Sequence, residues 1–236
     1  MNIFIAHWEP LIDRKKYLDN FFSNNSIHKP LYFCNFNRNK MTSNNIERYY
    51  SGFNPTYLEE SFIYVKKGFP NFNFNISQWK QLTPAQICNF LNHFSIYEYI
   101  IENKIENALI LEDDCILSPN FDNDIKEILL EKPEDCELLF LGGGGTGLTP
   151  QTYGSEFLPN KKFYKIPTSR TVDAYWLTWR TAFCFYKYIF WKRHFQLPID
   201  WEMNAIIPKE NISTYHLFPY FIKQGSATKQ YQTSAQ

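Results

Sequence analysis

The sequence predicts an α/β fold in which a mostly parallel sheet is flanked by helices in a single domain. Two short segments dominated by apolar residues, Ala108–Leu111 and Glu137–Leu141, are typical of strands that are buried on both faces of a parallel sheet. Segments with helical periodicity alternate with such strands along the chain, which favours parallel pairing. The length of 236 residues fits one domain of this class.

The first third of the chain is predicted to contain two strands, one helix and a long irregular region. We expect a strand over Asn2–Trp8, a helix over Asp13–Phe22 with Asp13 as its N-cap, and a strand over Pro30–Phe36. Residues 37–78 are rich in Asn and Tyr and lack a clear period, so we expect long loops with one or two short helices. A loop region of this length is either a lid over a bound ligand or an insertion without a binding role.

The clearest helix signal in the sequence begins at Thr83. Thr83 is the predicted N-cap, Pro84 takes the first helical position and Gln86 the third, which is typical of a capping box. A largely buried helix is predicted over residues 84–103, because apolar residues recur there at helical spacing, namely Ile87, Phe90, Leu91, Phe94, Tyr97 and Ile101.

Seven further elements complete the predicted order. They are a strand over 107–114, a helix over Phe121–Leu130, strands over Glu137–Leu141 and Thr171–Thr178, a helix over Arg180–Trp191, a short helix over Trp201–Ile207 with Asp200 as its N-cap, and a strand over Thr214–Phe218. We expect a β-hairpin or loop over residues 150–170 and a polar tail over Pro219–Gln236.

Three consecutive carboxylates, Glu112, Asp113 and Asp114, follow the apolar run that ends at Leu111. Isolated carboxylates in an apolar interior would neutralise or bind a cation, so we expect them at the carboxyl end of the strand, where open α/β sheets bind ligands. In an extended chain Glu112 and Asp114 point to one side and Asp113 to the other. The pattern favours a Mg²⁺ or Mn²⁺ site that holds substrate phosphates, with Glu112 and Asp114 as ligands. A solvated acidic loop is the alternative.

Composition excludes several classes of protein. Lys and Arg total 24, as do Asp and Glu, and a net charge of zero argues against a general nucleic-acid binder. The five cysteines are scattered without CxxC spacing, which favours free thiols in a reducing compartment. The sequence shows neither a leader pattern nor 18 consecutive apolar residues, so we expect a cytoplasmic protein, with peripheral membrane association left open. The segment Gly142–Gly145 has neither the lysine of a Walker motif nor GxGxxG spacing. We expect these glycines to permit close approach of a ligand or to form a flexible turn.

The segment Leu82–Ser118 resembles the signature of glycosyltransferase family 25, a helix with a Cys and a downstream Ser-His followed by a strand that ends in LILEDD. Cys88 and His93 occupy the matching positions, and Asn92 replaces the usual Ser. Shorter resemblances keep the family order: Asp13-Arg14 to its "DR", Asp173-Ala174-Tyr175 to its "HAY", Pro198-Ile199-Asp200 to its "PVD" and Gln224-Gly225-Ser226 to its "QGS". From the residues alone, we expect both Cys88 and His93 to be core residues.

This resemblance implies a GT-A-like fold, in which a Rossmann-like sheet holds a metal through a DxD-type motif. The nucleotide-sugar part would cover about residues 1–145 and the acceptor part about residues 146–236. The implied activity is metal-dependent transfer of a hexose from a UDP-sugar to an acceptor hydroxyl, with inversion and with Mn²⁺ or Mg²⁺ as the cofactor. The acceptor would be a glycan or a hydroxyl linked to protein or lipid.

The candidate metal ligands are Glu112 and Asp114, and Glu112 is also a candidate for the donor ribose. Four further residues are expected to bind the donor, namely Arg14, Asp113, Gly142 and Gln224. For Arg14 a surface salt bridge is the alternative, and for Gln224 a structural hydrogen bond.

An inverting transferase needs a carboxylate that accepts the proton of the acceptor hydroxyl. Asp200 is the first candidate because it stands at the start of a late helix, where a plain N-cap is the alternative, and Asp173 is the second. Two other functions stay open at this point: a nucleotidyltransferase or phosphotransferase that uses the same acids, and a degenerate, non-catalytic module that binds a glycan or a nucleotide.

Overall fold

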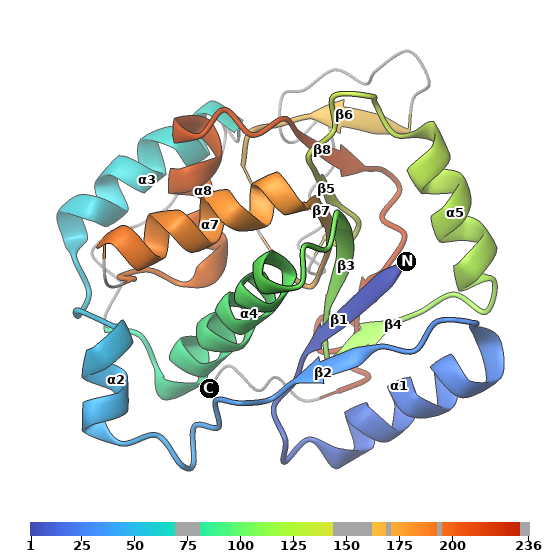
Figure 1. The fold of residues 1–236 in the computed structure, drawn as a ribbon, viewed down its shortest axis with the longest axis horizontal. Helices are drawn as coiled ribbons and strands as arrows, with labels where there is room; N and C mark the ends of the chain where they lie inside the picture. The colour runs from blue at the N-terminus through green and yellow to red at the C-terminus, as the bar shows by residue number, and fades with distance from the viewer. Residues whose placement is uncertain (69–80, 144–161, 169–170, 193–194, 232–236) are drawn as a thin grey trace.

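A computed structural model describes residues 1–68, 81–143, 162–168, 171–192 and 195–231 (Figure 1). The strands are β1 (Asn2–Ala6), β2 (Leu31–Phe33), β3 (Asn107–Glu112), β4 (Cys115–Ile116), β5 (Leu138–Phe140), β6 (Phe163–Lys165), β7 (Ala174–Thr178), β8 (Thr214–Leu217) and β9 (Lys223–Gln224). The helices are α1 (Ile12–Asn25), α2 (Ser43–Tyr49), α3 (Pro55–Gly68), α4 (Pro84–Glu102), α5 (Phe121–Glu131), α7 (Trp179–Lys192) and α8 (Ile199–Lys209).

Within the described residues, a central sheet of seven strands has the order β2-β1-β3-β7-β5-β8-β6. Strands β2, β1, β3, β5 and β8 point in one direction, because β2 and β3 pair parallel with β1, β5 pairs parallel with β8, and β7 runs antiparallel between β3 and β5. Strand β6 closes the edge antiparallel to β8, and β4 pairs with β9 in a separate small sheet. The prediction of a mostly parallel α/β sheet is confirmed, and the arrangement is consistent with a GT-A-like fold.

Helices cover both faces of the sheet, with α4 and α7 on one side and α1 and α5 on the other (Figure 1). Side chains along β3 point alternately to the two faces of the sheet, so this one strand contributes to the core on each face. Ala108 and Ile110 belong to the core beneath α4 and α7, whereas Leu109 and Leu111 belong to the core beneath α1 and α5. All four side chains are fully buried. Carboxylates that continued this alternation would be buried in an apolar layer without partners, so the chain leaves the sheet after Glu112.

Two predicted helix caps are wrong. Asp13 and Asp200 lie in the first turns of α1 and α8, whose N-caps are Leu11 and Pro198. The start of α8 shows the reason: the carbonyl oxygen of Pro198 already accepts from the amides of Trp201 and Glu202, at 3.0 and 2.9 Å. The helix therefore begins two residues earlier than an Asp200 cap would allow, and Asp200 stands near the positive end of the helix dipole instead.

Several predicted strands are longer than the observed ones, and the helices lie close to prediction. The strand predicted over 107–114 ends at Glu112, because Asp113 and Asp114 form a turn. In the region 37–78, α2 is short as expected, whereas α3 is a helix of 14 residues; residues 69–80 lie outside the described part. Of residues 150–170, the described part contains β6, whose partner is β8 rather than a neighbouring strand of a local hairpin.

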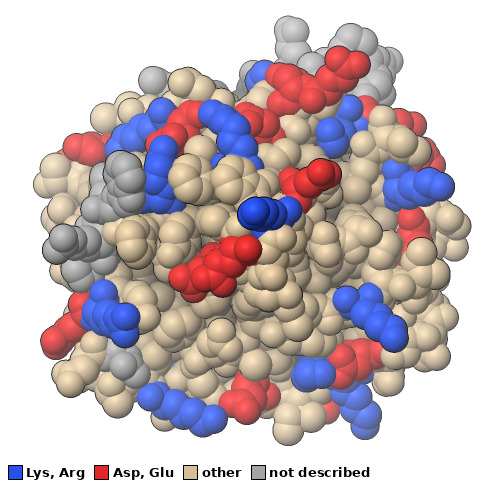
Figure 2. Space-filling view, viewed as in Figure 1, with Lys and Arg blue, Asp and Glu red and all other residues tan. Residues whose placement is uncertain are grey.

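The surface view shows acidic and basic side chains interspersed, without a large region of one sign on the face displayed (Figure 2). All five cysteines are free thiols, as predicted. Among the described residues, every helix is too short or too polar to cross a bilayer.

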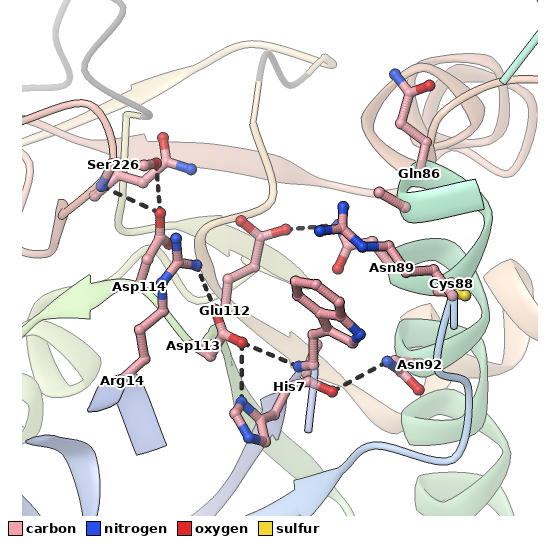
Figure 3. Close-up of a pocket in the computed structure, with 15 residues that line it drawn as sticks. His7, Arg14, Gln86, Cys88, Asn89, Asn92, Glu112, Asp113, Asp114 and Ser226 are labelled. Carbon is pink, nitrogen blue, oxygen red and sulfur yellow. Dashed lines mark hydrogen bonds and ion pairs between the residues drawn. The ribbon is translucent and has the colours of Figure 1, made fainter. Parts of the chain in front are cut away.

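The capping box of α4 is confirmed in both directions. Oγ1 of Thr83 accepts from the amide of Gln86 at 3.3 Å, and Oε1 of Gln86 accepts from the amide of Thr83 at 2.9 Å. This cap fixes the end of α4 that approaches the three acids (Figure 3).

We predict that Thr83→Ala lowers the free energy of unfolding by about 1 kcal/mol, because the amide of Gln86 loses its acceptor, Oγ1 of Thr83. Thr83→Ser keeps the hydroxyl and should lie close to the wild type. Urea denaturation followed by circular dichroism measures both variants. Equal stability of Thr83→Ala and the wild type would contradict a stabilising cap.

Candidate active site

The three acids line a cavity of about 140 Å³ at the point where β3 leaves the sheet. Its walls come from the carboxyl end of β1, the N-terminal half of α4, the start of α1 and the segment that follows β9 (Figure 3). The exposed fractions of Asp113 and Asp114 are 6% and 4%. This burial excludes the solvated acidic loop and leaves three carboxylates whose charges need partners.

Asp113 is held by three donors. Its Oδ1 accepts from Nη1 of Arg14 at 2.8 Å, and its Oδ2 lies 2.9 Å from Nδ1 of His7 and accepts from the amide of Trp8 at 3.0 Å. Arg14 is itself only 5% exposed, so this is a buried ion pair and the surface salt bridge proposed as an alternative for Arg14 is wrong. The Asp113 carboxylate therefore ties the end of β1 and the start of α1 to the end of β3.

Asp114 has a different environment. Its Oδ2 accepts from the hydroxyl of Ser226, and the amide of Ser226 lies 3.3 Å from the same oxygen. Its Oδ1 is buried and has no hydrogen-bond partner among the described residues. A buried carboxylate oxygen without a partner is costly, and a bound cation would remove that cost.

Burial raises the pKa of Asp114 to about 6, and the negative charge of Glu112 acts in the same direction. The hydroxyl of Ser226 and the charge of Arg14 act against this increase in pKa. The cavity therefore disfavours the ionised form of Asp114 as long as no cation is bound.

Glu112 is the third acid, and it is oriented by α4. Its Oε1 accepts from Nδ2 of Asn89 at 2.7 Å (Figure 3). The same oxygen lies 3.8 Å from Nε2 of His93. His93 is fully buried, and its Nδ1 lies 2.7 Å from the hydroxyl of Tyr175 on β7. His93 is therefore a core residue that also contacts the Glu112 carboxylate from the buried side.

The "QGS" segment reaches the acids from the far end of the chain. Gln224 lines the cavity and pairs in the β4–β9 ladder opposite Cys115, and Ser226 contacts Asp114 directly. Gly225 lies between them, with its amide 2.7 Å from the carbonyl oxygen of Asp114. A Cβ on Gly225 would lie 2.8 Å from that same oxygen, so only glycine lets the two segments approach this closely.

Gly142 and Asp173 lie together at the ends of β5 and β7. A Cβ on Gly142 would lie only 2.0 Å from Oδ2 of Asp173, so it is the Asp173 carboxylate that approaches this glycine. The carbonyl oxygen of Asp173 accepts from the amide of Glu112 at 2.8 Å and from the thiol of Cys115 at 3.0 Å. Asp173, which is 1% exposed, thus lies beside the acidic turn, and neither Asp173 nor Gly142 lines the acidic cavity itself. Gly144 and Gly145 lie outside the described residues.

Asp200 lies elsewhere in the fold. It belongs to the first turn of α8, a helix that packs against α3 and α7. It is not among the residues that line the acidic cavity. The structure therefore brings Arg14, Glu112, Asp113, Asp114 and Gln224 together, places Asp173 and Gly142 beside them, and leaves Asp200 apart.

The donor set fits a divalent cation that shares its ligands with a substrate. Among the described residues, no group of three or more His, Cys, Asp or Glu side chains could hold a metal ion on its own. Mg²⁺ that binds substrate phosphates typically needs only one or two carboxylates, because phosphate oxygens and waters complete the shell. The unpartnered Oδ1 of Asp114 and the neighbouring Glu112 carboxylate match that smaller set.

Sequence reasoning missed His7, Trp8, Arg38, Asn89 and Ser226. Asn89 stands one residue after Cys88 on the predicted helix, and Ser226 completes the "QGS" segment, so both lay within recognised motifs. Trp8 forms part of the cavity wall with Arg38, whose guanidinium lies 3.6 Å from the centre of the Trp8 ring. Nothing in the local pattern marks His7 as a partner of Asp113, because the two are 106 residues apart.

The chain matches the protein-family model described as Glycosyltransferase family 25 (LPS biosynthesis protein) over residues 2–161. That range contains Arg14, the cavity residues of α4 and the three acids, and it ends before Asp173, Asp200 and Gln224. A search of curated proteins finds no match.

We predict that Asp114→Asn stabilises the protein at pH 8 when EDTA removes divalent cations. Because the pKa of Asp114 is raised to about 6 in the folded state, folding favours its protonated form. The contribution of protonated Asp114 to the free energy of unfolding is complete below about pH 4. It is lost as the pH rises from there through the folded-state pKa of about 6, by an amount on the order of 3 kcal/mol. Asn is neutral at every pH, so the variant does not lose this stability when the pH rises.

Chemical denaturation at pH 4 and pH 8 measures this effect. The variant and the wild type should differ at pH 8 and converge at pH 4. Glu134→Gln, a change at an exposed carboxylate outside the cavity, is the control and should show no such dependence. A wild type that gains stability relative to Asp114→Asn between pH 4 and 8 would contradict the electrostatic analysis.

Proposed function

The chain belongs to glycosyltransferase family 25, and we propose that it transfers a hexose from a UDP-sugar to an acceptor hydroxyl, with inversion and with the help of Mn²⁺ or Mg²⁺. The protein is a glycosyltransferase, so it uses a sugar donor and a glycan acceptor. The family match favours glycosyl transfer over nucleotidyl transfer and over a non-catalytic binding module.

The observation that carries the metal proposal is the buried Oδ1 of Asp114, which has no hydrogen-bond partner among the described residues and lies in a cavity shared with Glu112. Two carboxylates in a small polar cavity, one of them partly unsatisfied, are the protein's share of a cation site that a donor diphosphate would complete. When bound, the cation would neutralise charge on the leaving diphosphate.

Each acid has a separate task in this proposal. Asp114, held by Ser226, and Glu112, held by Asn89, would be the cation ligands. Asp113 would act by positioning, because both of its oxygens are engaged by Arg14, His7 and Trp8. Rigid orientation of the ligands by neighbouring side chains favours a fixed geometry for the donor.

The donor would lie across the same cavity. Arg14 and Gln224 line it close to Asp114, which suits contact with phosphate oxygens. The cavity volume of about 140 Å³ is below the range of about 300–1,000 Å³ that is typical for whole ligands. We therefore assign this cavity to the charged diphosphate region of the donor, with the remainder of the nucleotide sugar extending beyond it.

The transfer step itself requires a base. The acceptor oxygen forms a bond to the anomeric carbon while the bond from that carbon to the UDP oxygen breaks, and the acceptor proton passes to a carboxylate. We propose Asp173 ahead of Asp200 for this role, because Asp173 adjoins Glu112, Cys115 and Gly142 at the edge of the sheet that holds the cation ligands.

We predict that Asp114→Ala loses metal-dependent transfer by on the order of 100-fold or more, because a principal electrostatic group at the reacting centre is removed. Release of UDP from UDP-glucose, UDP-galactose and UDP-N-acetylhexosamines, measured with Mn²⁺ and with EDTA, tests both donor and metal. Glu134→Gln is the control. Full activity of Asp114→Ala, or of the wild type in EDTA, would refute the metal proposal.

A second pair of variants tests the base. Asp173→Asn should lower kcat by about 100-fold or more, because an amide cannot accept the proton. Asp200→Asn should leave kcat close to that of the wild type. UDP binding should be unchanged in both variants, which separates the loss of a base from the loss of the donor site. The reverse order of effects on kcat would assign the base to Asp200.

A further inference from the structure

A second cavity, of about 310 Å³, lies where the start of α3, the end of α7 and the start of α8 meet. It shares no lining residue with the acidic cavity. Ser51, Thr56 and Glu60 are exposed and form its rim, while Tyr57, Ile189 and Glu202 are buried and form its base. One wall comes from the region 37–78 and the other from the C-terminal part of the chain.

The described lining of this cavity is almost entirely polar, and most of its side chains are uncharged. Except for Ile189, every described residue that lines it carries a hydroxyl, an amide or a carboxylate, and none is a Lys, Arg or His. Lys209 borders the cavity, where its Nζ donates to the hydroxyl of Tyr188 at 3.1 Å. The two carboxylates Glu60 and Glu202 outnumber this cation, so the described lining disfavours a phosphate group. Hydroxyls and amides both donate and accept, which suits a ligand that itself carries many hydroxyls.

Glu202 makes the base of the cavity a fixed structure. It is 2% exposed, and its Oε1 accepts from the amides of Gln196 and Leu197 at 2.7 and 3.0 Å. Its Oε2 accepts from the hydroxyl of Tyr57 at 3.0 Å. One buried carboxylate thus joins α8, α3 and the segment that precedes α8.

The remaining polar groups extend this network around the cavity. The hydroxyls of Tyr57 and Tyr188 lie 2.9 Å apart, and Nε2 of Gln196 donates to Oγ of Ser51 at 3.1 Å. Oδ1 of Asn54 accepts from the amide of Tyr57 at 3.2 Å and so caps the start of α3. The side chains are therefore positioned before any ligand arrives, which lowers the entropic cost of binding.

We infer that this cavity is a binding subsite for one neutral sugar unit of the acceptor. The inference rests on the proposed function, because it assigns the acceptor of the same transfer reaction. A volume of about 310 Å³ lies at the lower end of the range of about 300–1,000 Å³ that is typical of ligand sites, which suits a single sugar ring rather than a nucleotide. Nζ of Lys209 lies over the rings of Tyr57 and Tyr188, 5.6 and 5.5 Å from their centres, so a sugar would meet the ring edges and hydroxyls of these tyrosines.

The two cavities are connected through the core by a short path. Phe195, which precedes Gln196, stacks on Phe90 of α4 with ring centres 3.8 Å apart. Phe90 follows Asn89, the partner of Glu112 in the acidic cavity. The cavity itself is lined by α3, α7, α8 and the segments before α3 and α8, and the Phe195–Phe90 stack links it to α4. A glycan bound there would be an acceptor unit distant from the reacting hydroxyl.

Saturation-transfer NMR on the full chain tests this inference with methyl glucoside, methyl galactoside and N-acetylglucosamine as probes. Thr56→Trp places an indole at the exposed rim and should raise the Kd of the sugar, determined by titration of the saturation-transfer signal, by at least about tenfold, that is by at least 1.4 kcal/mol. Glu59→Trp is the matched control, because Glu59 is exposed on the same helix outside the cavity. Added UDP should leave the sugar signal unchanged.

The outcomes separate this inference from the proposed function. Sugar binding that Thr56→Trp removes, Glu59→Trp keeps and UDP does not displace supports the subsite. No binding by any probe, equal binding by Thr56→Trp, or displacement by UDP overturns it. Hydrolysis of UDP-sugars without an acceptor is measured in parallel. If the wild type hydrolyses none of the UDP-sugars, the proposed function is refuted but the sugar subsite is not. Both tryptophan variants should hydrolyse UDP-sugars at the wild-type rate.

Discussion

The structure depends on one electrostatic constraint: three consecutive carboxylates at the end of a buried strand must each be neutralised in a different way. Asp113 is neutralised by Arg14 with help from His7 and the amide of Trp8. Glu112 receives the amide of Asn89 from α4. Asp114 receives only Ser226, and its second oxygen stays buried without a hydrogen-bond partner among the described residues. In a purely structural cluster every carboxylate oxygen would have a partner, as both oxygens of Asp113 do. The buried oxygen of Asp114, which lacks a partner in the described part of the chain, is therefore the feature that points to a ligand.

This constraint explains why distant segments meet at one edge of the sheet. Five strands of the central sheet point the same way, so the ends of β1 and β3 lie side by side, and the helix dipole and side chains of α4 approach from one face (Figure 1). The segment after β9 reaches the site because Gly225 allows its backbone to touch that of Asp114. Polar contacts made by buried groups thus fix the positions of elements that apolar packing alone would leave free to shift.

The sequence was sufficient for the features that depend on local pattern. The buried strand, the capping box at Thr83 and the position of the acids at the strand end all follow from periodicity and from the cost of burying charge. The division of tasks among the acids did not follow, because it depends on partners such as His7 and Ser226 that are more than 100 residues away. The contact at Gly142 shows the same limit: the glycine was expected to face a ligand, and a carboxylate of the protein lies against it. The caps predicted at Asp13 and Asp200 were wrong because each helix begins two residues earlier than predicted, with Leu11 and Pro198 as the N-caps.

The central claim is that Asp114 and Glu112 become a complete cation site only when a donor diphosphate is present. Isothermal titration of UDP into the wild type and into Asp114→Asn, each with Mn²⁺ and with EDTA, tests this claim most directly. The account predicts that UDP binding requires Mn²⁺ in the wild type and is lost in the variant under both conditions. UDP that binds equally well in EDTA, or that binds Asp114→Asn as tightly as the wild type, would contradict it.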